Sequence, residues 1–313
     1  MIDKPGIYEN IPETDYHADP CPQPSLSSSV ARVLLSYSPR HAWHAHPRLN
    51  PNFEPEQSKR FDLGTTVHTI ILRRGRDIVE VEAPDFRTKG AQAMRDQAYA
   101  DGKTPVLTKD LKTAKAMAES ALVQLRGVHG AEKFFLEGAG RAETTLAWQE
   151  GPVWCRSRLD WLPNEAGQIV DFKTISSSAR PEGLGRRIAD QSYEVQAAFY
   201  ERGLIALEPS LAGRVSVVFV FQETDPPHAL SAVTLDAGGM DIGREKVEQA
   251  IELWTRCLSE NRWPSYPATI TEAQYPTWAL TFWNDRQARD HYAREDGKDP
   301  FSLLRADPHV RLD

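Results

Sequence analysis

Asp171 and Lys173 are the pair of residues in this chain whose types and spacing most favour chemistry. The segment Gln168–Thr174 is short, apolar and rich in β-branched residues, and it follows a Pro-Asn-Glu-Ala-Gly turn, so it predicts a β-strand. Residues two apart on a strand project from the same face, which places the carboxylate beside the amine. Val170 and Phe172 then face the opposite side, toward a core.

The preceding segment, Pro152–Leu162, alternates in the same way and carries Asp160 near its end. Two strands joined by a tight turn form a hairpin, which would bring Asp160 beside Asp171. Magnesium usually takes one or two protein carboxylates and keeps water and phosphate oxygens as its other ligands. A metal there would polarise a phosphoryl oxygen, and Lys173 would stabilise the developing negative charge. The alternative is that Asp171 and Lys173 form an exposed pair on an edge strand.

Two predicted helices carry further candidates. The segment Asp190–Leu207 has helical apolar spacing, and Gln196 and Tyr200 lie four residues apart on one of its faces. Upstream, Arg60–Arg74 is a predicted helix that carries His68. An isolated histidine on such a helix is more often a core residue than a ligand, and both interpretations of His68 stay open at this point.

Four short motifs together resemble the PD-(D/E)xK nuclease superfamily, and within it the RecE-type phage exonucleases (exonuclease VIII), relatives of the RecB nuclease domain and lambda exonuclease. The resemblance extends from Leu26 to about Trp263. Leu159 stands where the superfamily name places proline, and the second acid is aspartate where many members have glutamate, but both carboxylates are retained. The motifs are Gly64-Thr-Thr-Val-His68, Cys155-Arg-Ser-Arg-Leu-Asp160, Asp171-Phe-Lys173-Thr and Val195-Gln-Ala-Ala-Phe-Tyr200.

The resemblance implies a role for each matching residue. His68, Asp160, Asp171 and the backbone carbonyl of Phe172 would bind Mg²⁺, with Mn²⁺ able to substitute. Lys173 would be the catalytic lysine, with Gln196 and Tyr200 as the helix motif beside it. Glu143, at the start of the predicted strand Ala142–Gln149, is a possible additional acid or a solvated carboxylate at the strand end.

Some polar residues outside these motifs are candidates for DNA binding. Ser25–Ser29 precedes an apolar stretch and predicts a helix N-cap region, and helix N-termini also bind phosphate. Arginines that alternate along the Asp160 strand would line a basic channel if they face the substrate. The DNA-binding candidates are Ser28, Arg32, Arg156 and Arg158.

Composition limits the class of protein. The chain has 313 residues, 44 acidic and 37 basic, for a formal net charge of −7, so DNA binding requires local rather than overall positive charge. Three scattered cysteines argue against a disulfide framework and against an iron–sulfur cluster. No apolar run long enough for a bilayer and no secretory start are present, so we expect a soluble cytoplasmic protein. The resemblance implies that it is bacterial or phage-encoded.

The predicted elements form a central mixed sheet flanked by helices, an α/β or α+β fold of the restriction-endonuclease-like type. We expect an exonuclease domain at residues 1–263, with its core at about 60–262, and an irregular Pro- and Trp-rich tail at 264–313. Met1–Pro24 is expected to be extended and Ala83–Thr104 to be a polar stretch. Helices are predicted at 26–45, 60–74, 109–125, 190–207 and 240–261, and strands at 142–149, 152–162, 168–174, 215–222 and 229–235.

These features predict a magnesium-dependent deoxyribonuclease, and the resemblance implies an exonuclease that acts on double-stranded DNA ends. The resemblance implies 5′-to-3′ degradation, a 3′ single-stranded tail for recombination, a ring-shaped homo-oligomer and a single-strand annealing protein as partner. An endonuclease or flap nuclease on the same core is one alternative. A catalytically silent DNA-binding module is another, although such a module would have no need of His68, Asp160, Asp171 and Lys173 together.

Overall fold

A computed structural model of the chain describes residues 1–54 and 63–296. The chain divides into two compact units, Met1–Ser265 and Tyr266–Asp313. The strands of the first unit are β1 (Gly6–Tyr8), β2 (Leu26–Ser27), β3 (Ile78–Val81), β4 (Thr104–Leu107), β5 (Gly140–Glu150), β6 (Val153–Pro163), β7 (Gln168–Ile175), β8 (Ser216–Glu223) and β9 (Leu230–Thr234). Its helices are α1 (Glu13–His17), α2 (Ser28–Ser36), α3 (Pro39–His44), α4 (Leu63–Leu72), α5 (Lys89–Ala100), α6 (Thr108–Leu125), α7 (Pro181–Asp190), α8 (Tyr193–Leu207) and α9 (Ala237–Glu260), with a 3₁₀ turn η1 at Pro209–Leu211.

In the described residues, the main sheet has seven strands in the order β1-β5-β6-β7-β8-β9, with β2 paired to β6. β5, β6 and β7 form an antiparallel meander, β7 and β8 are parallel, and β8 and β9 are antiparallel. A parallel pair needs a crossover, and α7 with α8 supplies it between β7 and β8. The predicted mixed sheet is therefore confirmed, and the strands predicted from residue 142 onward match β5 to β9.

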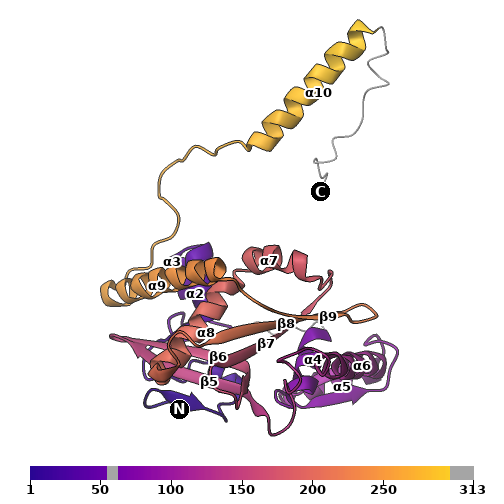
Figure 1. The fold of residues 1–313 in the computed structure, drawn as a ribbon, viewed down its shortest axis with the longest axis vertical. Helices are drawn as coiled ribbons and strands as arrows, with labels where there is room; N and C mark the ends of the chain where they lie inside the picture. Colours follow the sequence, from indigo (N-terminus) through magenta and orange to yellow (C-terminus); the bar gives the residue numbers. More distant parts are fainter. Residues whose placement is uncertain (55–62, 297–313) are drawn as a thin grey trace. The chain divides into compact units, whose positions relative to one another are not determined.

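The two faces of the sheet bury different cores because side chains alternate along each strand. On one face, Ile169 and Phe219 pack with Phe199 of α8 and Trp254 of α9. On the other face, Val170 and Phe172 pack with residues of α4 and α6, which confirms the prediction that they face a core. Figure 1 shows α4, α5 and α6 gathered together, away from α8 and α9. The sheet is thus a central layer with helices on both faces.

Residues 83–104 were predicted as a polar stretch without a helix, and the structure corrects this prediction. This region contains α5, and the flanking β3 and β4 form a separate two-stranded parallel sheet. Thr88 caps α5 by accepting a hydrogen bond from the backbone N–H of Ala91 at 3.2 Å. A short apolar cluster of Val81, Ala91 and Leu107 suffices for this small unit, which is why its hydrophobic pattern is weak in the sequence.

The helix predicted at 26–45 is two helices, α2 and α3, preceded by the short strand β2. Pro39 interrupts it because proline disfavours a helical conformation in the residue before it and lacks an N–H donor. Ser38 instead caps α3, and Ser27 caps α2 by accepting from the N–H of Val30 at 3.3 Å. The predicted N-cap region is therefore confirmed. The first residues of the helix predicted at 60–74, Arg60 to Asp62, lie outside the described residues.

The helix predicted at 190–207 begins at Tyr193, because Asp190 ends α7 and Ser192 lies in the left-handed region at φ 51°. The helix predicted at 240–261 begins earlier, at Ala237, where Asp236 accepts from the N–H of Gly239 at 2.8 Å. Met1–Pro24 is not simply extended, since it contains β1 and α1.

The second unit corrects the prediction of an irregular tail. It contains helix α10, Thr277–Glu295. The prolines of this region end at Pro276, and the following nineteen residues hold neither proline nor glycine, so nothing in them breaks a helix. Within residues 1–54 and 63–296, no helix is both long and apolar enough to cross a bilayer.

Candidate active site

The strands β6 and β7 meet at one residue pair, Trp161 opposite Val170, and this register places Asp160 opposite Asp171. The carboxylate oxygen Oδ2 of Asp160 accepts a hydrogen bond from the backbone N–H of Phe172 at 2.8 Å. A side chain thus takes the position that a strand carbonyl would otherwise hold, and the two strands separate there. The hairpin predicted from the alternating pattern is present, and it brings the two acids together.

Asp171 is buried, and Lys173 lies on the same face with its Nζ 2.5 Å from Asp171 Oδ1. Burial and then the nearby carboxylate of Asp160 raise the pKa of Asp171 to about 6, against the opposing effect of Lys173. Burial alone would lower the pKa of Lys173, but Asp171 and Asp160 outweigh it and the pKa is raised. Lys173 is therefore an ammonium group that donates hydrogen bonds, not a neutral base.

A chain of hydrogen bonds from α8 holds the Asp171 carboxylate. Gln196 Nε2 donates to Asp171 Oδ2 at 2.9 Å and lies 2.7 Å from the hydroxyl of Tyr200. That hydroxyl donates to the backbone carbonyl of Arg158 on β6 at 3.0 Å. Gln196 and Tyr200 lie on one face of the helix, as the sequence predicted, and together they link α8 to both strands of the hairpin.

His68 lies beside the two strands rather than in an apolar core. Its Nε2 is 3.1 Å from Asp160 Oδ1 and its Nδ1 is 3.9 Å from Glu143 Oε1. Burial alone would lower the pKa of His68, but the Asp160 and Glu143 carboxylates raise it above the ordinary value. The same contact lowers the pKa of Asp160 against the effect of its burial. The structure therefore brings His68 to the site, and its role as a metal ligand stays a prediction.

Glu143 faces the same cluster through an unusual backbone conformation. The register of β5 on β6 is the same on either side of it, so Glu143 lies opposite Asp160, yet its φ is +50°. The left-handed region costs a residue with a Cβ roughly 1–2 kcal/mol. The side chain forms an ion pair with Arg158, whose Nε donates to Glu143 Oε2 at 3.0 Å. A local strain at this position aims a carboxylate at the site.

Two aromatic residues at the site carry no signal that the sequence patterns above detect. Tyr193, at the start of α8, lies with its ring 5.0 Å from Lys173 Nζ and stacks on Phe219. Tyr16, from the segment expected to be extended, is buried below the guanidinium groups of Arg156 and Arg158. The only sequence signal for Tyr193 is its position, three residues before Gln196 on the same predicted helix. Tyr16 can be assigned to the site only from its contacts in the folded structure.

The residues predicted to bind DNA differ in their placement. Ser28 is half-buried in the first turn of α2, and Arg32 lies over the ring of Tyr193 at 5.7 Å. Arg156 is buried, and its guanidinium faces Asp19 and Ser25 instead of solvent. Arg158 is held by Glu143 beside the site. Direct DNA contacts by these residues stay a prediction, and both Arg156 and Arg158 already have a carboxylate partner.

Two carboxylates are the donors that the site offers to a divalent cation. Among the described residues, no group of three or more His, Cys, Asp or Glu side chains converges on one metal position. Magnesium, however, requires only one or two protein carboxylates. Asp160 and Asp171 supply two adjacent acids, one of which has its pKa raised by the other, and a bound cation would remove that repulsion. The pair fits a hard divalent metal that completes its shell with water and phosphate.

The fold and the site together define a domain of the PD-(D/E)xK nuclease superfamily: a mixed sheet, an acid on each of two hairpin strands, an Asp-x-Lys and a glutamine on α8. The chain belongs to the family described as PDDEXK-like domain of unknown function (DUF3799), whose model matches residues 29–274. Membership in this family indicates a nuclease.

One solved structure supports the fold. A proposed exonuclease from Eubacterium rectale is 11% identical, covers 87% of this chain and 98% of its own, and superposes with a TM-score of 0.53. At that identity the likeness shows the fold alone. A second structure, SSO0001, is 13% identical over 60% of this chain and 85% of its own, and its TM-score of 0.24 carries no argument. No curated protein matches the sequence.

Proposed function

We propose that this chain is a divalent-metal-dependent exodeoxyribonuclease of the RecE type, which degrades double-stranded DNA from its ends in the 5′-to-3′ direction and leaves 3′ single-stranded tails for recombination. The observation that carries the proposal is a set of contacts between four elements: His68 lies beside Asp160, and Lys173 and Gln196 both contact Asp171, which stands opposite Asp160. A silent DNA-binding module would gain nothing from a buried carboxylate with a raised pKa.

The residues divide the work as follows. Asp160 and Asp171 would hold Mg²⁺ or Mn²⁺, together with the Phe172 carbonyl and His68, which already contacts Asp160. When bound, such a metal polarises the phosphoryl oxygen and lowers the pKa of its water. Lys173, as an ammonium, would orient the attacking water by donating a hydrogen bond and would stabilise the charge that develops on the phosphoryl group.

Gln196 and Tyr200 act on this chemistry by positioning. Gln196 donates to Asp171, and Tyr200 ties Gln196 to the backbone of β6, so the carboxylate has little freedom to rotate. Fixed groups cost no reorganisation when charge develops, which is the main source of electrostatic catalysis. Glu143 is a further acid near the metal position, with its charge shared between His68 and Arg158.

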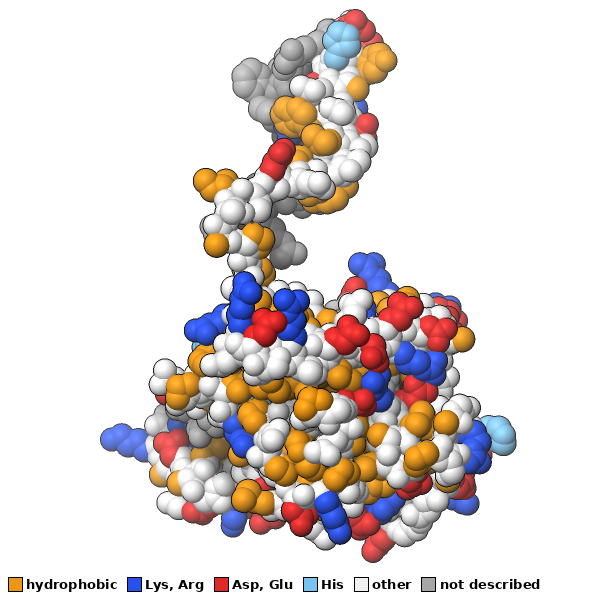
Figure 2. All heavy atoms as spheres, turned by 90° about the vertical axis from the view of Figure 1, so that its left-hand side faces the viewer, with side chains coloured by type: hydrophobic (Ala, Val, Ile, Leu, Met, Phe, Trp, Pro, Cys, Tyr) orange, Lys and Arg blue, Asp and Glu red, His pale blue; other side chains and the backbone are white. Residues whose placement is uncertain are grey.

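DNA binding requires no basic balance over the whole surface. Acidic and basic side chains are interspersed on the face of the first unit seen in Figure 2, with no area of a single sign. Local arginines beside the site supply the attraction in this proposal. The proposed ring-shaped homo-oligomer and single-strand annealing partner follow from the RecE-type assignment, and the mass of the particle in solution, with and without DNA, tests the first of them.

The experiment follows cleavage of a linear duplex, labelled at either the 5′ or the 3′ end, by the full chain with Mg²⁺. A closed circle of the same sequence is the control. We expect mononucleotide release from the 5′ label first and an intact circle. Cleavage of the circle would instead favour an endonuclease, the second candidate from the same chemistry. An uncut linear duplex across divalent metals and pH values would leave only a silent DNA-binding module.

A further inference from the structure

A cavity of about 350 Å³ opens next to the candidate active site, and neither the family nor the proposed catalytic roles assign it a function. Glu143 and Arg158 belong both to the catalytic cluster and to the cavity wall. The cavity thus borders the candidate active site through these two side chains. Its volume is at the low end of the range for small-ligand sites, about 300–1,000 Å³. A single nucleotide is a ligand of that size.

The opposite walls come from two distant segments. One is Glu9–Thr14, which contributes the apolar side chains of Ile11 and Pro12, and the other is the turn Arg74–Arg76 that follows α4. Because α4 also carries His68, the turn is fixed to the same helix as a catalytic residue. The N-terminal segment is in turn tied to β6, since Arg158 donates to the carbonyl of Ile11 at 2.9 Å.

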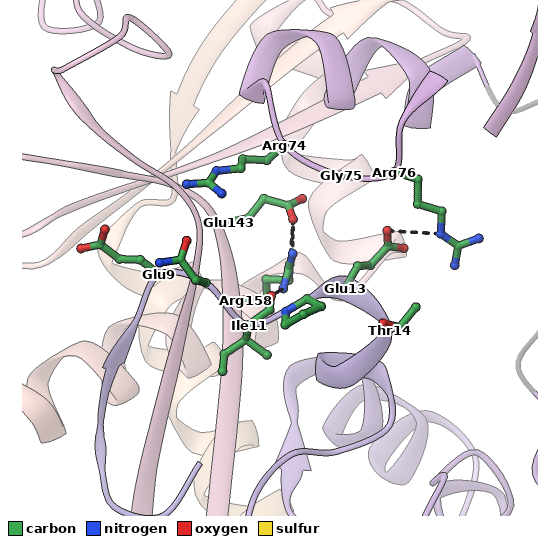
Figure 3. A pocket seen from close by; sticks show the side chains of 11 residues that line it. Glu9, Ile11, Glu13, Thr14, Arg74, Gly75, Arg76, Glu143 and Arg158 are labelled. Carbon is green, nitrogen blue, oxygen red and sulfur yellow. Dashed lines mark hydrogen bonds and ion pairs between the residues drawn. The ribbon is translucent and has the colours of Figure 1, made fainter. Parts of the chain in front are cut away.

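The turn sends two arginines in different directions. Gly75 lies between them at φ +117°, and a Cβ there would meet Thr69 Oγ1 at 2.9 Å. Glycine is the residue that adopts this conformation without steric cost. In Figure 3 the guanidinium groups of Arg74 and Arg76 point toward opposite ends of the cavity.

Some of the charged side chains that line the cavity have an ion-pair partner within the described part of the chain, and others do not. Arg158 pairs with Glu143, and Arg76 Nε lies 3.5 Å from Glu13 Oε2. Glu9 pairs with Arg141, which lies outside the cavity lining. Among the described residues, no carboxylate lies within ion-pair distance of the Arg74 guanidinium. As far as the described residues go, the Arg74 guanidinium is therefore a cationic group that an anion can reach at the rim of a nucleotide-sized space.

We propose that this cavity holds one nucleotide of the DNA strand being cut, with the phosphates on either side of it at Arg74 and Arg76, and Ile11 and Pro12 against its sugar and base. This inference rests on the proposed function. Glu13 then competes with phosphate for Arg76, because the ion pair must open when the strand enters. The N-terminal segment is a wall of the substrate site.

The test measures DNA binding by the full chain, with Asp171→Asn in every protein to block cleavage. The readout is the fluorescence anisotropy of a labelled duplex with a short single-stranded end, recorded at several salt concentrations. We expect Arg74→Ala to raise the Kd about tenfold and to reduce the slope of log K against log salt by about 0.7–0.9, the value of one phosphate contact. Glu13→Gln should lower the Kd, because it removes the competing carboxylate.

Arg73→Ala is the matched control, since it removes the same charge one position away, where Arg73 pairs with the exposed Glu137 at 2.6 Å. An equal loss of affinity in Arg73→Ala and Arg74→Ala would overturn the proposal, because it would mean diffuse attraction rather than a site. As a ligand probe, deoxynucleoside 5′-monophosphates should inhibit cleavage by the wild type competitively, and Arg74→Ala should weaken that inhibition.

The two proposals fail in different ways. If wild-type protein cleaves no DNA, the nuclease proposal fails, and the anisotropy measurement still decides whether Arg74 binds a phosphate. If wild-type protein cleaves DNA and Arg74→Ala binds as tightly as Arg73→Ala, the cavity does not hold the strand and the nuclease proposal stands.

Discussion

Two clusters of this molecule use the same residue types, an aspartate, a histidine and a basic side chain, with opposite results. In the first, Asp19 is buried and fully partnered by Ser25, by His46 Nε2 at 3.3 Å and by Arg156 at 3.1 Å. Burial alone would raise the pKa of Asp19, but His46 and Arg156 lower it below the ordinary value. This cluster is closed, and it joins the segment before α2 to β6.

In the second cluster, Asp171 has a neighbour of its own sign, and its pKa is raised to about 6 by burial and by Asp160. This cluster adjoins an open cavity, whereas the first has no face to solvent. The difference teaches that residue type does not decide between structure and chemistry. An acid that faces only groups of opposite charge or hydrogen-bond donors, like Asp19, stabilises the fold. An acid that also has a second carboxylate beside it, like Asp171, is suited to bind a cation between the two.

The largest expected effect is that of Asp171→Asn on cleavage. The variant keeps the shape of the side chain but loses a metal-binding charge, so we expect cleavage to fall on the order of 10³-fold or more. In metal-free buffer the same change should raise the free energy of unfolding by roughly 1–2 kcal/mol, because the cost of burying the charge and the repulsion with Asp160 both disappear, which outweighs the lost contact with Lys173. Initial rates and urea denaturation measure the two effects.

Asp96→Asn, which changes an exposed acid of α5, is the control and should alter neither the cleavage rate nor the free energy of unfolding. Retained cleavage in Asp171→Asn would remove Asp171 from the site. Loss of cleavage together with lower stability would mean that Asp171, like Asp19, has a structural role.

The second effect is that of Asp19→Ala on stability. It leaves Arg156 buried without its counter-charge, so the free energy of unfolding should fall by about 3–5 kcal/mol. At a temperature where the variant is folded, cleavage per folded molecule should stay within a few-fold of wild type. Asp15→Ala, an exposed acid of α1, should change stability by about 0.5 kcal/mol or less. A loss of cleavage at unchanged stability would place Asp19 in the catalytic machinery instead.

The third effect is an opposite dependence of the two acids on pH. The pKa of Asp19 is lowered in the folded protein, so its contribution to stability is present above the unfolded pKa of about 3.9 and is lost as the pH falls through the folded pKa. The pKa of Asp171 is raised, so its contribution is present below about 3.9 and is lost as the pH rises through about 6.

Denaturation of the metal-free proteins between pH 3 and pH 8 measures both contributions. The stability gain of Asp171→Asn over wild type should grow between pH 4 and pH 6, and the deficit of Asp19→Ala should shrink below pH 4. Parallel pH profiles for the two variants would contradict the distinction between the clusters.

The smallest effect is that of Tyr200→Phe. It removes a hydroxyl that bridges Gln196 and the carbonyl of Arg158, so stability should fall by about 1 kcal/mol. Because Gln196 keeps its bond to Asp171, kcat should fall only about three- to tenfold while KM stays the same. A change in KM alone would mean that Tyr200 contacts DNA rather than positions Gln196. Steady-state kinetics and thermal denaturation decide between these roles.

Local sequence predicted much of the site because its main parts are close along the chain. Alternation placed Asp171 and Lys173 on one face of β7, a tight turn placed Asp160 opposite, and helical spacing placed Gln196 beside Tyr200. His68 is different, because its residue type and helical position fitted both a core residue and a metal ligand. Only the packing of α4 against the sheet brought it to 3.1 Å from Asp160.

The elements that local patterns missed are those with weak or interrupted periodicity. The helix predicted at 26–45 breaks at Pro39, α5 has little apolar surface, and α10 follows a proline-rich stretch that suggested an irregular chain. The strand pair of β2 with β6 is set by a partner more than a hundred residues away, at Cys155 and Arg156, which no local pattern encodes.

The sequence by itself determined the mixed α/β class, the hairpin of acids and the Asp-x-Lys, because strand alternation and helical spacing are local properties of the backbone. The tertiary structure decided which charges are balanced. It enclosed Asp19 with Arg156 and His46, set Asp171 against Asp160, turned Glu143 toward His68 and placed Glu9–Thr14 across from Arg74. Charge balance depends on distance and burial, and both are fixed only when segments far apart in the chain pack together.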